Sequence, residues 1–100
     1  MEKEQTSQGR QTKYKTPEPS MYHVIMHNDD VTTMDFVVMV LMRVFRKPQE
    51  EAERLMWQIH NEGSALVGTY FYDIAQSKAE YTMKLARANG FPLKLTLEEA

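Results

Sequence analysis

The alternation of apolar and polar residues becomes regular only after position 20. Residues 21–27, MYHVIMH, alternate between two sides, and one side is more apolar than the other. Successive side chains of a strand point to opposite faces, so this period of two predicts a strand. The more apolar side carries Tyr22, Val24 and Met26, and the other side carries His23, Ile25 and His27.

A strongly apolar segment follows the turn after this strand. Thr32 stands three residues before Asp35, which is the spacing of a capping box. We therefore expect a helix over about residues 33–46, with Thr32 and Asp35 capping its start. The segment is apolar on nearly every side, so most of this helix should be buried or should cover a site.

A second helix is expected from Pro48, which suits a first helical turn. Apolar residues then recur at the i, i+3, i+4 and i+7 spacing of a helix face. Gly63 should end this helix, because glycine readily adopts the left-handed conformation common at helix C-termini. The apolar stripe consists of Ala52, Leu55, Met56 and Ile59.

The C-terminal third of the chain contains two short strands around a helix. Residues 64–70, SALVGTY, read as a strand that Gly68 weakens in the middle. A helix is expected over about residues 72–89, and Gly90 should end it. Residues 93–97, LKLTL, alternate as a third strand. The seam of small residues along the helix consists of Ala75, Ala79, Thr82 and Ala86.

The expected order is strand, helix, helix, strand, helix, strand, which predicts an α+β fold. A three-stranded sheet with three helices on one face is the simplest closed packing of these elements. We expect this single domain to span residues 21–100. Residues 1–20 hold only two large apolar residues, Met1 and Tyr14, so we expect a disordered extension. This extension lacks the apolar stretch of a secretory signal.

Composition narrows the function classes. The net charge is −2, with no basic stripe, which argues against nucleic-acid binding. No apolar run approaches the about 20 residues that cross a membrane. The chain has no cysteine, which excludes disulfides and fits the reducing cytoplasm. It also has no phosphate-binding loop, nucleophile elbow or HExxH motif.

A cluster of polar residues, Asn28-Asp29-Asp30, stands between the first strand and the first helix. It can be read as a turn that starts a helix, since acidic residues stabilise helix N-termini. It can also be read as a site for a positively charged group. The second reading is favoured by redundancy: if Thr32 and Asp35 cap the helix, Asn28 and Asp29 have no structural role.

A metal site is an alternative use of these residues. Two histidines and a carboxylate form a known ligand set, and His27, Asp29 or Asp30, and His60 could supply it. Their spacing in the sequence is not diagnostic of metal binding. We therefore expect no bound metal or other cofactor.

Three segments together resemble the ClpS family, whose members are adaptors for a Clp AAA+ protease. They are NDDVTTM, LMWQIHNEG and FPLKLTLEEA. They match the family patterns N-D-D-x-T-x-M, M-x-x-[VI]-H-x-x-G and a C-terminal P-L strand, in order and at similar spacing. The resemblance covers residues 21–100. It implies a non-enzymatic adaptor whose fold is similar to that of the C-terminal domain of the ribosomal stalk protein.

The resemblance assigns the polar cluster to the free α-amino group of a substrate protein. An ammonium needs hydrogen-bond acceptors, which Asn28, Asp29 and a neutral His60 would provide, with Asp30 and Thr32 as a supporting shell. The adjoining apolar residues would bind an N-terminal Leu, Phe, Tyr or Trp side chain. That pocket would consist of Met34, Val37, Met56, Ile59 and Leu93. Met34, at the family's gate position, should disfavour the β-branched Ile and Val.

The resemblance also implies how the adaptor would reach the protease. Asp73 and Lys78, in DIAQSK, match the family's docking face for the N-terminal domain of a ClpA-like or ClpC-like unfoldase. Gln76 and Ser77 depart from the family pattern there. The N-terminal extension would serve in substrate delivery, and we expect a monomer. A stalk-like docking module that does not bind N-terminal peptides is the alternative.

Overall fold

The computed structural model describes residues 19–100, so nearly all of the expected N-terminal extension lies outside the described residues. The element order is the one predicted. It consists of β1 (Met21–His27), α1 (Met34–Arg43), α2 (Gln49–Glu62), β2 (Ser64–Phe71), α3 (Tyr72–Ala88) and β3 (Lys94–Glu99).

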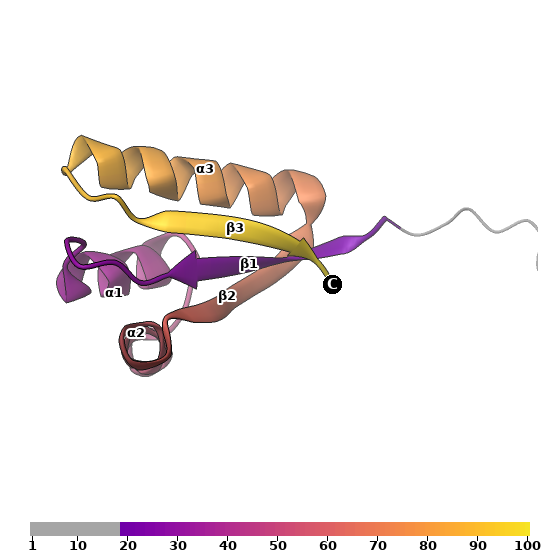
Figure 1. The fold of residues 1–100 in the computed structure, drawn as a ribbon. Helices are drawn as coiled ribbons and strands as arrows, with labels where there is room; N and C mark the ends of the chain where they lie inside the picture. Colours follow the sequence, from indigo (N-terminus) through magenta and orange to yellow (C-terminus); the bar gives the residue numbers. More distant parts are fainter. Residues whose placement is uncertain (1–18) are drawn as a thin grey trace, which may run out of the picture.

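The three strands form one antiparallel sheet in the order β2-β1-β3 (Figure 1). The alternation along β1 is confirmed, since Val24 and Met26 are fully buried. On the opposite face, the ring of His23 shares a hydrogen bond with the Thr69 hydroxyl. The ring of His27 does the same with the Thr96 hydroxyl. One face of the sheet therefore holds the core, and the other carries polar side chains.

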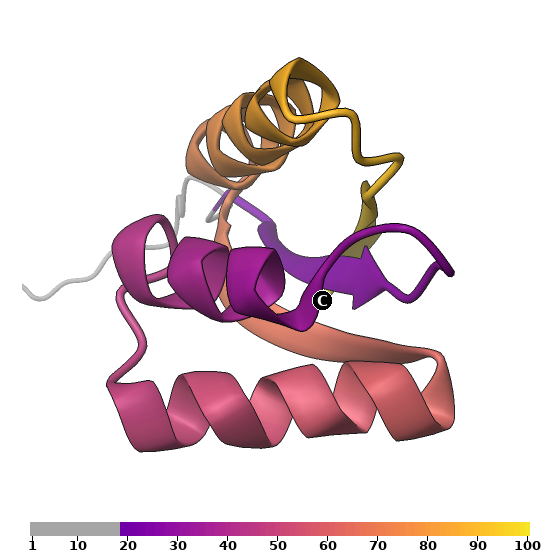
Figure 2. The same ribbon diagram turned by 90° about the vertical axis from the view of Figure 1, so that its left-hand side faces the viewer.

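The helices cover the apolar face. Helix α3 contacts all three strands, α2 contacts β2, and α1 packs against α2. In Figure 2, which looks onto the end of the molecule where the loop after β1 lies, α1 appears between α2 and α3. The predicted apolar stripe of α2 and small-residue seam of α3 are both confirmed as the buried faces of their helices. The predicted α+β fold, with helices on one face of the sheet, is therefore confirmed.

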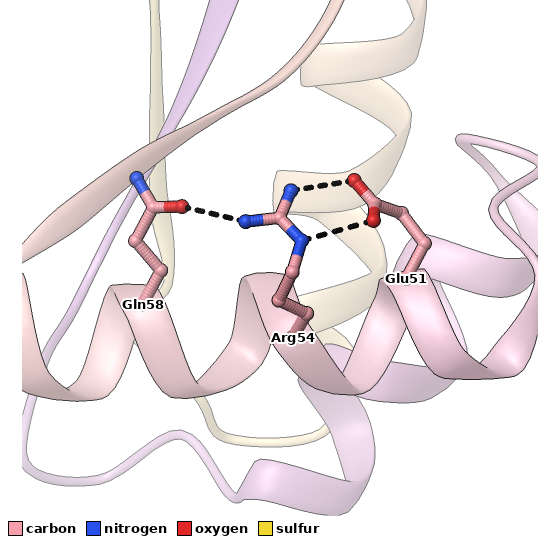
Figure 3. A network of polar contacts seen from close by, with 3 residues as sticks. All are labelled: Glu51, Arg54 and Gln58. Carbon is pink, nitrogen blue, oxygen red and sulfur yellow. Dashed lines mark hydrogen bonds and ion pairs between the residues drawn. The ribbon is translucent and has the colours of Figure 1, made fainter.

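Part of the solvent-facing side of α2 carries a polar network. The Arg54 guanidinium makes two hydrogen bonds to the Glu51 carboxylate, 2.6 and 3.0 Å long, and a third to the Gln58 amide oxygen (Figure 3). The hydrogen bonds from Arg54 lower the pKa of the Glu51 carboxyl. Exposed ion pairs of this kind contribute little to stability. We therefore assign no important stabilising role to this network on the outer surface of α2.

The middle of β2 contains a β-bulge that explains its glycine. Val24 pairs with Gly68, but Ile25 pairs with Leu66, so Val67 is the extra residue. A Cβ atom at Gly68 would lie only 2.4 Å from the Tyr70 hydroxyl oxygen. The glycine therefore makes room for the Tyr70 ring, which packs over the strand.

The start of α1 corrects the predicted capping. The N-cap is Thr33, whose hydroxyl accepts a hydrogen bond from the Phe36 backbone N–H at 3.2 Å. Thr32 makes no capping bond of this kind, because its backbone N–H and its hydroxyl both bind Asp29. The predicted capping box of Thr32 and Asp35 is therefore wrong.

Helix α1 also ends earlier than predicted. Its last residue is Arg43, because Phe45 turns into the core and Arg46 adopts a left-handed φ of 59°. The Lys78 ammonium, on α3, donates to the Val44 carbonyl at 2.6 Å. It also lies 5.9 Å from the centre of the Phe45 ring. This lysine ties α3 to the C-terminal end of α1.

One buried polar atom in the core gives a stability prediction. The Thr82 hydroxyl is fully buried and has no hydrogen-bond partner among the described residues. Burying an unpaired hydroxyl costs free energy, and threonine and valine have similar helix propensities. We expect Thr82→Val to raise the free energy of unfolding by about 1 kcal/mol, measured by urea denaturation. A fall in stability would mean that the hydroxyl has a partner in solution.

Candidate functional site

A cavity of about 400 Å³ opens where the end of β1, the start of α1 and the end of α2 meet. Polar residues of the loop after β1 form one side, and apolar residues of the two helices form the other. The lining consists of Asn28, Asp29, Asp30, Val31, Thr32, Thr33, Met34, Val37, Met56, Ile59 and His60. A ligand in this cavity would meet hydrogen-bond acceptors at one end and an apolar wall at the other.

A backbone hydrogen bond brings the polar side together. The Asn28 N–H donates to the Gly63 carbonyl at 2.9 Å, which extends the pairing of β1 and β2 by one step beyond His27 and Ser64. Gly63 has a φ of 95° and ends α2 in the left-handed conformation, as predicted. His60 lies in the last turn of the same helix. This bond therefore holds Asn28 beside the helix end that carries His60.

Asp29 organises the loop after β1. Its Oδ1 atom accepts from the backbone N–H groups of Val31, at 2.8 Å, and Thr32, at 2.7 Å. Its Oδ2 atom accepts from the Thr32 hydroxyl at 2.7 Å. The inference that Asp29 has no structural role is therefore wrong. A carboxylate offers about four acceptor positions, so one remains, and Asp29 can hold the loop and still accept from a ligand.

The same hydrogen bonds keep Asp29 ionised. Partial burial alone would raise the pKa of its carboxyl, but the bonds from Thr32 and Val31 outweigh this and lower the pKa below its ordinary value. The positive charge of Arg87 acts in the same direction. A carboxyl with a lowered folded-state pKa stabilises the fold above its unfolded-state pKa, and this contribution is lost as the pH falls through the folded value. Asp29 is therefore an anion at neutral and mildly acidic pH.

Asn28 and His60 have unused hydrogen-bonding capacity. No hydrogen bond joins either side chain to another residue within the described range 19–100, and both residues are exposed. The His60 ring contacts the edge of Trp57, with ring centres 5.8 Å apart. The amide oxygen of Asn28 and the unprotonated nitrogen of a neutral His60 are thus available to accept from a ligand.

The apolar wall is built by residues of α1 and α2 that face the cavity. Val37, Met56 and Ile59 are buried, whereas Met34, the first residue of α1, is 39% exposed at the edge. Leu93 was expected in this wall, but it is 1% exposed and does not line the cavity. Its contact with a ligand stays a prediction.

The structure brings together all the other residues expected at the ammonium site and in the pocket. It adds Val31 and Thr33, which sequence reasoning missed. The only feature of the sequence that could have indicated Val31 and Thr33 is their position in the polar loop, next to residues that were assigned to the site. Val31 is 57% exposed and forms part of the outer rim.

The alternative metal site is not formed. The described residues contain no group of three histidine, cysteine, aspartate or glutamate side chains placed to hold a metal ion. His27 cannot join Asp29 and His60 in the cavity, because its ring lies on the open face of the sheet beside Thr96. Among the described residues there is also no helix long and apolar enough to cross a membrane.

The two residues expected to dock the unfoldase lie at the start of α3, away from the cavity. Asp73 is exposed in the first helical turn. Lys78 is only partly exposed, and its ammonium is engaged by the Val44 carbonyl and the rings of Phe45 and Tyr70. No pattern in the sequence indicated this structural role of Lys78.

Comparisons with known proteins show the family of the chain. The family model described as "ATP-dependent Clp protease adaptor protein ClpS" matches residues 17–96. The chain is 47% identical to the ATP-dependent Clp protease adapter protein ClpS of Treponema denticola over 97 residues, which is 97% of this chain and 96% of the relative. It is 47% identical to the same adapter of Syntrophus aciditrophicus over 85 residues, covering 85% and 79% of the two chains.

A solved structure is also similar. The structure of Agrobacterium tumefaciens ClpS2 bound to L-phenylalaninamide matches with a TM-score of 0.80 and 40% identity. The match covers 83% of this chain and all of the other chain. The fold, the family model and the relatives agree over most of the described residues. The chain therefore belongs to the ClpS family of ATP-dependent Clp protease adaptor proteins.

Proposed function

We propose that this adaptor binds substrate proteins by a free N-terminal Leu, Phe, Tyr or Trp residue and delivers them to a Clp AAA+ unfoldase for degradation. The observation that carries the proposal is the cavity, where unengaged acceptors of Asn28 and His60 adjoin the ionised Asp29 and an apolar wall. An α-ammonium group is a compact cation with three N–H donors, which matches three acceptors from different segments.

The related protein that was solved with L-phenylalaninamide supports this assignment by chemistry. That ligand carries a free α-amino group and an apolar side chain, the two features that the cavity here could accommodate. Charge-assisted hydrogen bonds contribute about 1.5–3 kcal/mol each, and burial of a Leu or Phe side chain contributes about 1.5–3 kcal/mol. With the costs of association subtracted from these contributions, we expect an affinity no tighter than the order of micromolar.

The shape of the entrance supports a preference among N-terminal residues. Met34 lies at the edge of the cavity at the first position of α1, where Thr33 fixes the helix start. A thioether there would crowd a side chain that branches at Cβ, but it can yield to a side chain that branches further out. We therefore propose that Ile and Val are disfavoured and that Leu, Phe, Tyr and Trp are accepted.

The proposed protease partner of the adaptor is the N-terminal domain of a ClpA-like or ClpC-like unfoldase. Asp73 and the partly exposed Lys78 both belong to the first half of α3, and neither lines the cavity. Substrate and unfoldase could therefore bind at the same time to a monomeric adaptor. Because the protease is ATP-dependent, the proposed site of action is the cytoplasm.

Fluorescence anisotropy with a C-terminally labelled peptide that begins with Leu tests the proposal. We expect binding on the order of micromolar for the free peptide and none for the same peptide acetylated at its N-terminus. Acetylation removes the charge and two donors but leaves the side chain unchanged. Equal binding of the two peptides, or binding of neither, would contradict the proposal and favour a docking module that does not use the cavity.

Two alanine variants should separate ligand binding from loop stability. Asn28→Ala removes an acceptor without breaking a side-chain bond within residues 19–100, so affinity should fall about tenfold or more while stability changes by less than about 0.5 kcal/mol. Asp29→Ala should weaken binding and also lower the free energy of unfolding by about 1 kcal/mol.

The control for these variants is Thr32→Val, which removes only the hydroxyl bond to the Asp29 Oδ2 atom. It should destabilise the loop but keep the discrimination between free and acetylated peptides. The assignment of Asp29 would be contradicted if its alanine variant retained the parent's affinity for the free peptide.

His60→Ala should weaken binding of the free peptide about tenfold or more, because it removes one acceptor for the ammonium. His23→Ala, on the open face of the sheet, is the matched control and should keep the parent's affinity. The same anisotropy assay measures both variants, and an unchanged affinity in His60→Ala would contradict the role of His60.

A further inference from the structure

A second hollow of about 630 Å³ lies between α1 and α2, next to the cavity. Five of its lining residues have flexible or aromatic apolar side chains, and we call it the methionine groove. They are Met34, Met39, Met42, Met56 and Trp57. Methionine side chains adapt to ligands of different shape, so surfaces rich in them suit varied sequences.

The methionine groove exposes apolar surface to solvent. The side chain of Trp57 is 50% exposed, and Met34 and Met42 are 39% and 37% exposed. Contiguous exposed apolar residues on a small protein mark binding sites more often than isolated ones do. Met56 belongs to the buried face of α2 and therefore lies where the core meets the groove.

The groove is continuous with the cavity of the proposed function. Met34 and Met56 line both hollows, and the Trp57 ring centre is 5.8 Å from that of His60. An extended peptide advances about 3.3 Å per residue. Two residues of such a chain therefore span the distance from an ammonium at His60 to Trp57.

We propose that the methionine groove is a second substrate subsite, which takes an apolar or aromatic side chain at the second or third position of the N-terminal peptide. This inference rests on the proposed function, because the ammonium at His60 sets the starting point of the peptide. With this subsite, the adaptor would recognise the second or third residue of the peptide as well as the first. The occupant is the substrate chain itself, which can pass from the cavity into the groove because Met34 and Met56 line both.

Charges at the edge of the groove refine the preference. Asp35 and Glu53 contribute carboxylates, and Arg43 contributes one guanidinium. The balance is negative on the side of the groove formed by these residues, so an acidic side chain at position two or three is repelled. A basic or neutral one is not.

The test compares C-terminally labelled peptides that begin Leu-Gly-Gly, Leu-Phe-Gly, Leu-Gly-Phe and Leu-Asp-Gly, each free and acetylated at its N-terminus. In the parent, one of the two Phe peptides should bind about threefold to tenfold more tightly than Leu-Gly-Gly, and the Asp peptide more weakly. Trp57→Ala should abolish the gain from Phe but keep the dependence on a free amine.

Val31→Ala is the matched control, because Val31 is a similarly exposed apolar residue that lines the cavity but not the methionine groove. It should keep the gain from Phe. If the gain is lost in Val31→Ala and kept in Trp57→Ala, the peptide leaves over the loop and the inference is overturned. It is equally overturned if the parent shows no gain from Phe while still requiring a free amine.

The single tryptophan of the chain gives a second readout without any substitution. Its emission should shift to shorter wavelength with the favoured Phe peptide, because the peptide side chain covers the indole, and should change little with Leu-Gly-Gly. Equal spectra with both peptides would overturn the inference. If no peptide distinguishes a free from an acetylated terminus, the proposed function itself fails, and the inference fails with it.

Discussion

The site depends on one backbone hydrogen bond, from the Asn28 N–H to the Gly63 carbonyl. It joins the end of β1 to the end of α2, two segments that are far apart in the sequence. Because Gly63 reverses the chain in a left-handed conformation, the last turn of α2 is held against the loop after β1. In the proposed site, the acceptors of Asn28 and His60 reach the same ligand only while this junction is intact. The cavity is thus a property of the sheet and its connections, not of any single motif.

Asp29 connects the architecture of the loop with the proposed chemistry. Three hydrogen bonds from Val31 and Thr32 fix its carboxylate and keep it ionised. The loop therefore does not need to reorganise when a cation binds, which lowers the ordering cost of association. The same bonds engage Thr32 and leave Thr33 to cap α1, so the geometry of the helix start and that of the polar cluster are set together.

Periodicity, together with the positions of proline and glycine, predicted the order of the elements, because β1 alternates cleanly and the buried stripe of α2 recurs at helical spacing. Resemblance predicted most of the cavity lining. Choosing between Thr32 and Thr33 as the cap was beyond sequence reasoning, since both hydroxyls stand at plausible spacing and Asp29 decides between them. The role of Lys78 at the end of α1 was equally hidden, because it depends on the Val44 carbonyl, 34 residues away. Long-range polar contacts of this kind leave no local pattern.

The most direct test of the central claim is an NMR titration of the isotope-labelled protein with leucinamide and with N-acetyl-leucinamide. If the polar loop and the end of α2 clamp an ammonium, leucinamide should shift the Asn28 side-chain amide, the His60 ring and the Gly63 backbone amide. The acetylated compound should leave these signals in place. Identical shifts with both compounds, or shifts confined to α3, would contradict the account.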